Sequence, residues 1–199
     1  WSSDVCSSDL SALFNYLTGF SELPMWKKLI LAPSGLRDFL IESIEREAAL
    51  GSKGRIVAKI NAVLEPEVIR ALYRASRAGV QIDVICRGIC GLRPGIPGVS
   101  ENIRVTSIVD RFLEHSRIYY FGNEGKPKVF IGSADWMDRN LIRRIEAVFP
   151  VEAPDLRGRI IQILAICLAD NVKSRVLRSD GAWVRTTASA NAVKLRSQQ

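Results

Sequence analysis

Histidine, methionine and cysteine are all scarce in this sequence of 199 residues, which contains one, two and four of them, respectively. Cys86, Cys90 and Cys167 stand among apolar residues, a pattern typical of buried, reduced thiols rather than of a disulfide framework. The spacing of Cys86 and Cys90 does not match a zinc knuckle. No apolar run approaches the roughly 18 residues that a membrane-spanning helix needs, and no segment has the pattern of a signal peptide. These absences favour a cytosolic protein.

The balance of charge and apolar content describes a basic, globular chain. Apolar residues make up 47% of the sequence, enough for a substantial core in one domain or in half of something larger. The 28 basic and 21 acidic residues give a formal net charge of +7, which favours a polyanionic partner such as a nucleotide, a nucleic acid, polyphosphate or an anionic lipid. A basic surface without such a partner explains the same charge equally well.

The two ends of the sequence differ in composition from the rest. Residues 1–10 show no periodicity and resemble a translated sequencing adaptor, so we predict no structural role for them. We expect one domain over residues 11–185 and a loose polar tail over residues 186–199. No initiator methionine precedes Ser11, which predicts that the sequence is a fragment of a longer protein.

Apolar periodicity predicts alternating strands and helices. Apolar residues spaced three and four positions apart predict a helix that begins after Gly35. Glu65 before Pro66 is typical of the start of a second helix. The predicted helices cover residues 11–20, 36–50, 66–78 and 154–169, and the predicted strands cover residues 26–32, 55–60, 80–86, 103–108, 117–121, 129–133 and 145–151. This alternation predicts an α/β domain with a mixed sheet covered by helices.

Polar side chains that suit phosphate chemistry lie at or near the predicted strand ends, where such sheets bind their ligands. His115 and Arg117 are two residues apart on an extended segment, so they share a face and can converge on one phosphoryl group. Gly88 leaves the backbone beside Arg87 uncrowded, which suits a phosphate clamp. The candidate residues are Lys59, Asn61, Arg87, His115, Arg117, Ser133 and Asp135.

Each candidate also has a structural interpretation. His115 has the alternative of a core histidine bound to a backbone carbonyl, and Arg87 that of a cation paired with a carboxylate at a strand end. Ser133 and Asp135 are more often turn formers than ligands. The combination of an imidazole, guanidinium groups and strand ends favours phosphoryl chemistry over these separate explanations.

Several segments together resemble the C-terminal region of bacterial polyphosphate kinases of the polyphosphate kinase 1 type. The resemblance runs from about Phe14 to Val184. Its segments are residues 61–64, 66–76, 84–90, 100–104, 111–115, 133–137 and 170–173.

This resemblance implies an enzyme that reversibly transfers the terminal phosphate of ATP to polyphosphate through a phosphohistidine and with Mg²⁺. The family's catalytic module is similar to phospholipase D, so the implied fold is a phospholipase D-like mixed sheet flanked by helices. In that superfamily two related halves each provide His-x-Lys and Gly-Ser-x-Asn. Here Arg117 stands in place of the lysine and Asp135 in place of the asparagine, which indicates a departure from diester hydrolysis.

The resemblance also implies roles for individual residues. The phosphorylated histidine belongs to the other catalytic half, which we expect before Ser11. His115 matches the family's second histidine, a catalytic phosphate ligand and possible acid or base, and Arg87 matches the arginine that contacts the nucleotide phosphates. With these two, Arg117, Ser133, Lys59 and Asn61 complete the expected ATP and phosphate site. The magnesium ligands are expected outside this chain, and the chain alone is expected to turn over little or nothing.

The implied partners are ATP or ADP, polyphosphate and the missing N-terminal, head and first catalytic domains, but not a nucleic acid. The resemblance further implies a homo-oligomer in the full-length enzyme, a cytoplasmic location and association with the inner membrane face. Two rival functions stay open at this point. One is a phospholipase D-like phosphodiesterase or nuclease, and the other is a non-enzymatic polyanion-binding module in which His115 is structural.

Overall fold

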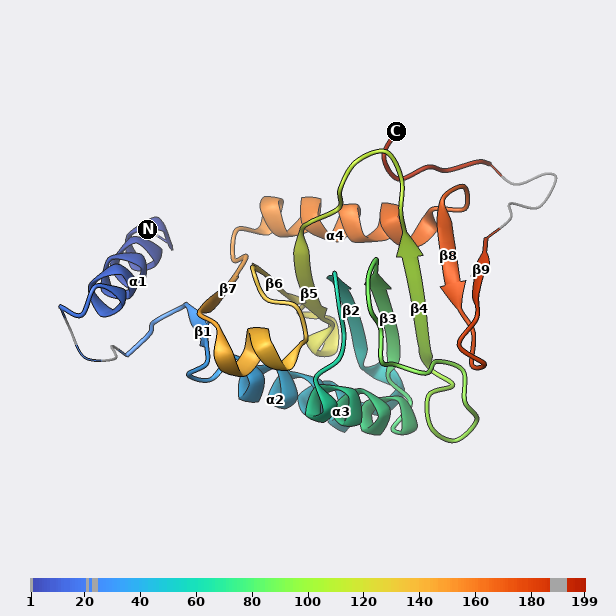
Figure 1. The fold of residues 1–199 in the computed structure, drawn as a ribbon, viewed down its shortest axis with the longest axis horizontal. Coiled ribbons are helices and arrows are strands. Elements are labelled where there is room, and N and C mark those ends of the chain that lie inside the picture. The colour runs from blue at the N-terminus through green and yellow to red at the C-terminus, as the bar shows by residue number, and fades with distance from the viewer. Residues whose placement is uncertain (1, 21, 23–24, 187–192) are drawn as a thin grey trace.

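A computed structural model describes residues 2–20, 22, 25–186 and 193–199 and places them around one mixed sheet (Figure 1). In the described residues the strand order across the sheet is β1-β7-β6-β5-β2-β3-β4-β8-β9. The strands are β1 Ile30–Ala32, β2 Arg55–Ile60, β3 Gln81–Cys86, β4 Ile103–Ile108, β5 Arg117–Phe121, β6 Lys128–Gly132, β7 Glu146–Pro150, β8 Ser174–Leu177 and β9 Trp183–Arg185. The helices are α1 Ser2–Leu17, α2 Leu36–Ala49, α3 Pro66–Arg77 and α4 Pro154–Ala169, with short helical turns η1 Gly51–Lys53, η2 Asn123–Gly125 and η3 Arg139–Arg143.

Helices cover both faces of the sheet, with α2 and α3 on one face and α4 on the other (Figure 1). The side chains of β2 alternate between two cores: Ile56 and Ala58 belong to the core that includes residues of α2 and α3, and Val57 belongs to the core that includes residues of α4. The central strands are apolar on both faces for this reason. The predicted α/β fold with a helix-flanked mixed sheet is confirmed.

The β2-α3-β3 unit forms where the sequence predicts it. The carboxylate of Glu65 accepts a hydrogen bond from the backbone N–H of Val68 at 2.6 Å, and Pro66 occupies the first turn, where its missing N–H costs nothing. Arg74 and Arg77 lie in the last turn, where their positive charges stabilise the negative end of the helix dipole. The helix carries the chain back so that β2 and β3 run parallel and end at the same edge of the sheet.

The N-terminus differs from its prediction. Residues 2–10 form the first half of α1, and their adaptor-like origin stays a prediction. The buried carboxylate of Asp9 accepts hydrogen bonds from the backbone N–H groups of Lys27, Lys28 and Leu29. Because these amides bind a carboxylate and not a neighbouring strand, the strand predicted over residues 26–32 contains only Ile30–Ala32.

The C-terminal region also differs from its prediction. Strands β8 and β9 were missed, because they contain only four and three residues, respectively, and are the last two strands on one side of the sheet, with β9 at its edge. Residues 187–192 of the predicted loose tail lie outside the described residues. The end of the tail is bound: Ser197 donates to Asp170 through its backbone N–H and its hydroxyl, both at 2.8 Å, and Arg196 donates to Asp110. These partners lie far away in sequence, so composition alone did not indicate them.

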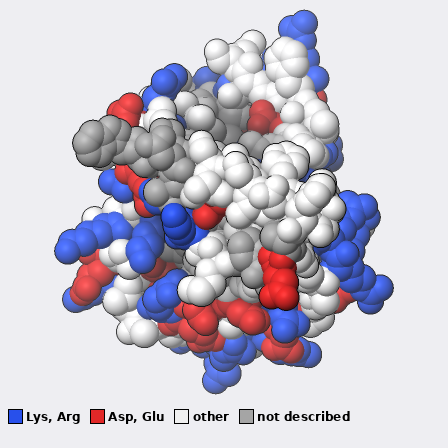
Figure 2. Space-filling model, turned by 90° about the vertical axis from the view of Figure 1, so that its left-hand side faces the viewer, with Lys and Arg blue, Asp and Glu red and all other residues white. Residues whose placement is uncertain are grey.

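Basic residues are not concentrated on the surface on the side of α1 and β1. Figure 2 shows a broad uncharged area there, with basic and acidic side chains mingled around it. Exposed apolar residues of α1, including Phe14 and Leu17, match the uncharged character of this side. No helix in the described part of the chain is long and apolar enough to cross a membrane.

Candidate active site

Four strand ends meet at one edge of the sheet and bring the candidate residues together. The ends of β2 and β3 lie side by side because these strands are parallel, and Lys59 of β2 is paired with Ile118 near the start of antiparallel β5. The start of β5 is in turn paired with the end of β6, where Arg117 opposes Gly132. The candidate residues after β2, after β3, before β5 and after β6 therefore lie at one edge of the sheet.

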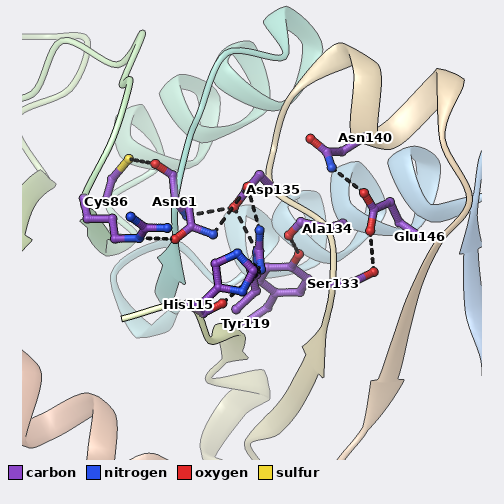
Figure 3. Close-up of polar contacts among 11 residues, drawn as sticks. Asn61, Cys86, His115, Tyr119, Ser133, Ala134, Asp135, Asn140 and Glu146 are labelled. Atoms are coloured by element: carbon purple, nitrogen blue, oxygen red, sulfur yellow. Dashed lines mark hydrogen bonds and ion pairs between the residues drawn. The ribbon is translucent and has the colours of Figure 1, made fainter. Parts of the chain in front are cut away.

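Asp135 is the centre of the hydrogen-bond network at this edge (Figure 3). Its carboxylate accepts from Arg117 Nε at 3.2 Å and from Arg117 Nη2 at 3.1 Å, an ion pair in which both side chains are largely buried. The same carboxylate accepts from the backbone N–H of Asn61 at 2.7 Å and from its side-chain amide at 3.4 Å. Such two-pronged contacts fix the plane of the guanidinium as well as its position.

The sequence indicated Asp135 as a candidate near a strand end but left it out of the expected ATP and phosphate site, because aspartate at this position is more often a turn former. A signal was present in the two departures from the phospholipase D-like motifs, arginine for lysine at residue 117 and aspartate for asparagine at residue 135. The structure shows that the two departures compensate each other, since the new guanidinium pairs with the new carboxylate.

His115 is exposed and lies on the segment just before β5, next to Arg117. Arg117 Nη1 lies 3.0 Å from His115 Nδ1, 3.2 Å from His115 Nε2 and 3.0 Å from the carbonyl oxygen of His115, to which it donates. A guanidinium has no acceptor, so any ring nitrogen that it hydrogen-bonds is the unprotonated one. The exposure excludes the alternative of a core histidine and leaves the ring open to a ligand.

Arg87 extends the network on the side of β3. Its Nε donates to Asn61 Oδ1, while Nη1 and Nη2 have no hydrogen-bond partner among the residues that the structure describes. The Gly88 N–H donates to the Asn61 carbonyl at 2.9 Å, and a Cβ on Gly88 would lie 2.6 Å from that oxygen. Glycine is therefore required for this close approach, and Arg87 keeps two donor nitrogens for an anion. A cavity of about 280 Å³ opens beside Arg87 and is lined by it and residues 108–114.

The sequence predicted Lys59 as part of the phosphate site, whereas the structure places its side chain in the interior. Its side chain is buried, and its ammonium forms an ion pair with Glu114 at 3.1 Å and donates to Ser116 Oγ at 2.8 Å. These two partners are the neighbours of His115 on either side. Lys59 therefore supports the segment that carries the imidazole.

Ser133 also turns away from His115. Its hydroxyl donates to Glu146 of β7 and accepts from the backbone N–H of Ala147 at 3.2 Å. Asn140 of η3 donates its side-chain N–H to the same carboxylate, so Glu146 joins two segments beside the site (Figure 3). Glu146 and Asn140 were not singled out from the sequence, which carries no motif signal for them.

The buried Tyr119 secures the turn that carries Ser133 and Asp135. Its hydroxyl donates to the carbonyl oxygen of Ala134, the residue between them. Burial raises the pKa of Tyr119, so the hydroxyl stays protonated and keeps donating at physiological pH.

Gly132 is needed where β6 approaches β7, directly before this turn. A Cβ at this position would overlap the Ala147 carbonyl oxygen and lie 2.6 Å from Val148 Cγ2. We expect Gly132→Ala to lower the free energy of unfolding by about 1–3 kcal/mol, measured by chemical denaturation. Gly158→Ala on α4 is the matched control, because nothing lies within 4 Å of its Cβ position and alanine favours a helix. Equal stability of both variants would contradict the close approach.

Comparisons with known proteins show the family of this chain. The family model for polyphosphate kinase C-terminal domain 2 matches residues 29–198. The chain belongs to the polyphosphate kinase family. It is 55% identical over 181 residues to a polyphosphate kinase of Synechocystis sp., a match that covers 89% of this chain and 25% of the relative. It is 52% identical over 186 residues to a polyphosphate kinase of Pseudomonas aeruginosa, covering 92% of this chain and 27% of the relative.

Solved structures of polyphosphate kinase and of a phospholipase D family member share the fold. The crystal structure of polyphosphate kinase from Porphyromonas gingivalis superposes with a TM-score of 0.91 at 44% identity, over 96% of this chain and 30% of that one. Nuc from Salmonella typhimurium, a phospholipase D family member, superposes with a TM-score of 0.57 at 17% identity, over 76% of this chain and 97% of that one. The predicted phospholipase D-like fold is confirmed. The chain spans about a quarter of the length of the polyphosphate kinases that it matches.

Proposed function

We propose that this chain is the phosphate-binding half of the catalytic site of an ATP-polyphosphate phosphotransferase, which reversibly transfers the terminal phosphate of ATP to polyphosphate. The phosphohistidine belongs to a half outside this chain. The observation that carries the proposal is the array of His115, Arg117, Asn61 and Arg87, which Asp135 joins into one hydrogen-bonded network at the rim of the sheet. Membership of the polyphosphate kinase family supports it.

Each side chain of the array has a separate role. Arg87 offers two nitrogens to the oxygens of a nucleotide phosphate, in the planar geometry that suits two parallel hydrogen bonds. Arg117 holds positive charge next to His115, which binds the transferring phosphoryl group and exchanges a proton with it. Positioned charge and alignment of this kind account for most of the catalysis of phosphoryl transfer. Lys59 and Ser133 act indirectly, through the segments that they hold.

The carboxylates of this site do not by themselves fit a magnesium ion, which the family resemblance implies. Asp135 is bound by Arg117 and Asn61, and Glu146 is bound by Ser133 and Asn140. No group of three or more His, Cys, Asp or Glu side chains suited to a metal ion occurs in residues 2–20, 22, 25–186 and 193–199. The roles given above therefore belong to the side chains of this chain alone.

The partners follow from the same proposal. ATP or ADP and polyphosphate are the substrates, and the remaining domains of the full-length enzyme complete the site. Homo-oligomerisation, a cytoplasmic location, association with the inner membrane face and the lack of a nucleic-acid partner stay predictions from the resemblance.

The test is Arg87→Ala in the full-length enzyme that contains this segment. We expect ATP-dependent polyphosphate synthesis to fall by about 10²–10³-fold, as for other preorganised donors to a transition state, with the melting temperature unchanged. Arg70→Ala is the matched control, because this exposed arginine of α3 pairs with Glu67. Normal turnover in the Arg87 variant would reject the assignment. Diester cleavage without ATP would favour the phosphodiesterase alternative, and salt-dependent binding unaffected by His115→Ala would favour a non-enzymatic module.

A further inference from the structure

Residues 196–198 lie against the loop that joins β4 to β5 and leads to His115 (Figure 1). Gln198 binds both backbone groups of Phe112: its Oε1 accepts from the N–H at 2.8 Å, and its Nε2 donates to the carbonyl oxygen at 2.9 Å. The same Nε2 donates to Glu114 Oε1 at 2.9 Å. One side-chain amide therefore binds the backbone at residue 112 and the carboxylate at residue 114.

The loop has little internal support. Residues 110–114 form no hydrogen bond between backbone groups in the part of the chain that the structure describes. The side chains of Phe112 and Leu113 are 60% and 71% exposed, so they contribute little apolar burial that would stabilise one conformation of the loop. The conformation of the loop therefore depends on partners outside it.

The segment that binds the loop is itself held in place. Arg196 donates through Nε and Nη2 to the two carboxylate oxygens of Asp110, at 2.6 and 2.7 Å, a two-pronged contact that fixes the start of the loop. The buried carboxylate of Asp170, at the end of α4, accepts from Ser197 and from the backbone N–H groups of residues 172–174, which lead into β8. The loop is thus bound to a segment that α4 and β8 position.

The contact between Gln198 and Glu114 adjoins the imidazole of the site. Glu114 Oε1 accepts from Gln198, while Oε2 pairs with the Lys59 ammonium at 3.1 Å, so the carboxylate is held from two sides. His115 is the next residue, and its position depends on where the backbone of Glu114 lies.

We propose that Gln198 is a positioning residue for phosphoryl transfer, because it fixes the loop from which His115 reaches the phosphoryl group next to Arg117. The effect on catalysis rests on the proposed function, whereas the ordering of the loop does not. Gln198 acts through Phe112 and Glu114 and has no contact with the imidazole itself.

The test is Gln198→Ala in the full-length enzyme that contains this segment. Lys59 still holds the other oxygen of Glu114, so we expect kcat for polyphosphate synthesis to fall by about 10-fold rather than by the roughly 10²-fold that a larger misplacement causes. KM for ATP should change little, because Arg87 is anchored on Asn61 and not on this loop. Hydrogen exchange at residues 112–116 should become at least about 10-fold faster.

Two further variants support this test. Gln199→Ala is the matched control with unchanged kcat and exchange, because this neighbouring glutamine is exposed and its side chain has no hydrogen-bond partner among the described residues. Gln198→Glu keeps the length of the side chain and an acceptor for the Phe112 N–H. Its carboxylate has no donor and repels Glu114, so we expect kcat to fall at least as far as in Gln198→Ala.

Each outcome decides a separate point. Unchanged kcat in both Gln198 variants, or equal losses in Gln198→Ala and Gln199→Ala, overturns the proposal. Faster exchange without a fall in kcat, or a rise in KM for ATP that accounts for the whole loss of activity, shows that the contact does not position His115. If the parent enzyme makes no polyphosphate from ATP, the proposed function is contradicted, while hydrogen exchange still decides whether Gln198 orders the loop.

Discussion

Asp135→Ala in the full-length polyphosphate kinase is expected to reduce polyphosphate synthesis by about 10²–10³-fold and also to destabilise the domain. The substitution leaves Arg117, a largely buried guanidinium, without its carboxylate, and leaves the backbone N–H of Asn61 without its acceptor. Removal of one partner from a buried ion pair costs about 3–5 kcal/mol. Activity and the free energy of unfolding, measured on the same preparation, check both expectations.

Asp135→Asn tests the effect of the negative charge of this residue, because asparagine keeps nearly the same shape. The amide keeps an oxygen for the Asn61 N–H but removes the charge that compensates Arg117, so we expect a loss of stability that is smaller than for Asp135→Ala. Arg117 loses its counter-charge and its second acceptor, so we expect kcat to fall and its dependence on pH to change, because the guanidinium that contacts His115 is released. A variant with full activity would show that the network around Asp135 does not position the catalytic groups.

Lys59→Met is expected to lower kcat by about 10²-fold with only a moderate loss of stability, because a small misplacement of a reacting group has an effect of this size. The ammonium holds Glu114 and Ser116, and these residues hold His115 between them. Glu114 is partly exposed and also accepts from Gln198 at 2.9 Å, so water and this second partner limit the cost to about 1–2 kcal/mol of folding free energy.

The readouts for Lys59 distinguish positioning from simple destabilisation. Faster hydrogen exchange at residues 114–116 and a change in the pH profile of kcat are expected, whereas KM for ATP changes little, because Arg87 keeps its anchor on Asn61. Lys28→Met is the matched control, since its partner Glu152 follows β7, and Lys28 is not part of the His115 network. If both lysine variants behave alike, the supporting role of Lys59 is disproved.

The elements that the sequence predicted well are those whose signals are local. The end of β2, the start of α3 at Pro66 and both ends of α4 agree with the structure, because apolar periodicity, capping and proline act within a few residues. α1 up to residue 10 and strand β8 escaped prediction, because each is stabilised by partners far away in sequence, and β9 forms only by pairing with β8. Asp9, for example, binds amides 18–20 residues later.

Sequence alone predicted the family, the α/β class and the placement of Asn61, Arg87, His115 and Arg117 at or near strand ends. The family followed from resembling segments, and the other two features followed from the order of strands and helices and from which residues end each strand. Only the tertiary structure shows which side chains are hydrogen-bonded to one another. The register across β2, β5 and β6, for example, brings Asp135 to Asn61 over a separation of 74 residues. The same register places the Lys59 ammonium beside Glu114 and Ser116, the neighbours of His115. The end of a strand determines the edge of the sheet on which a residue lies, but it does not determine the hydrogen-bond partner of that residue.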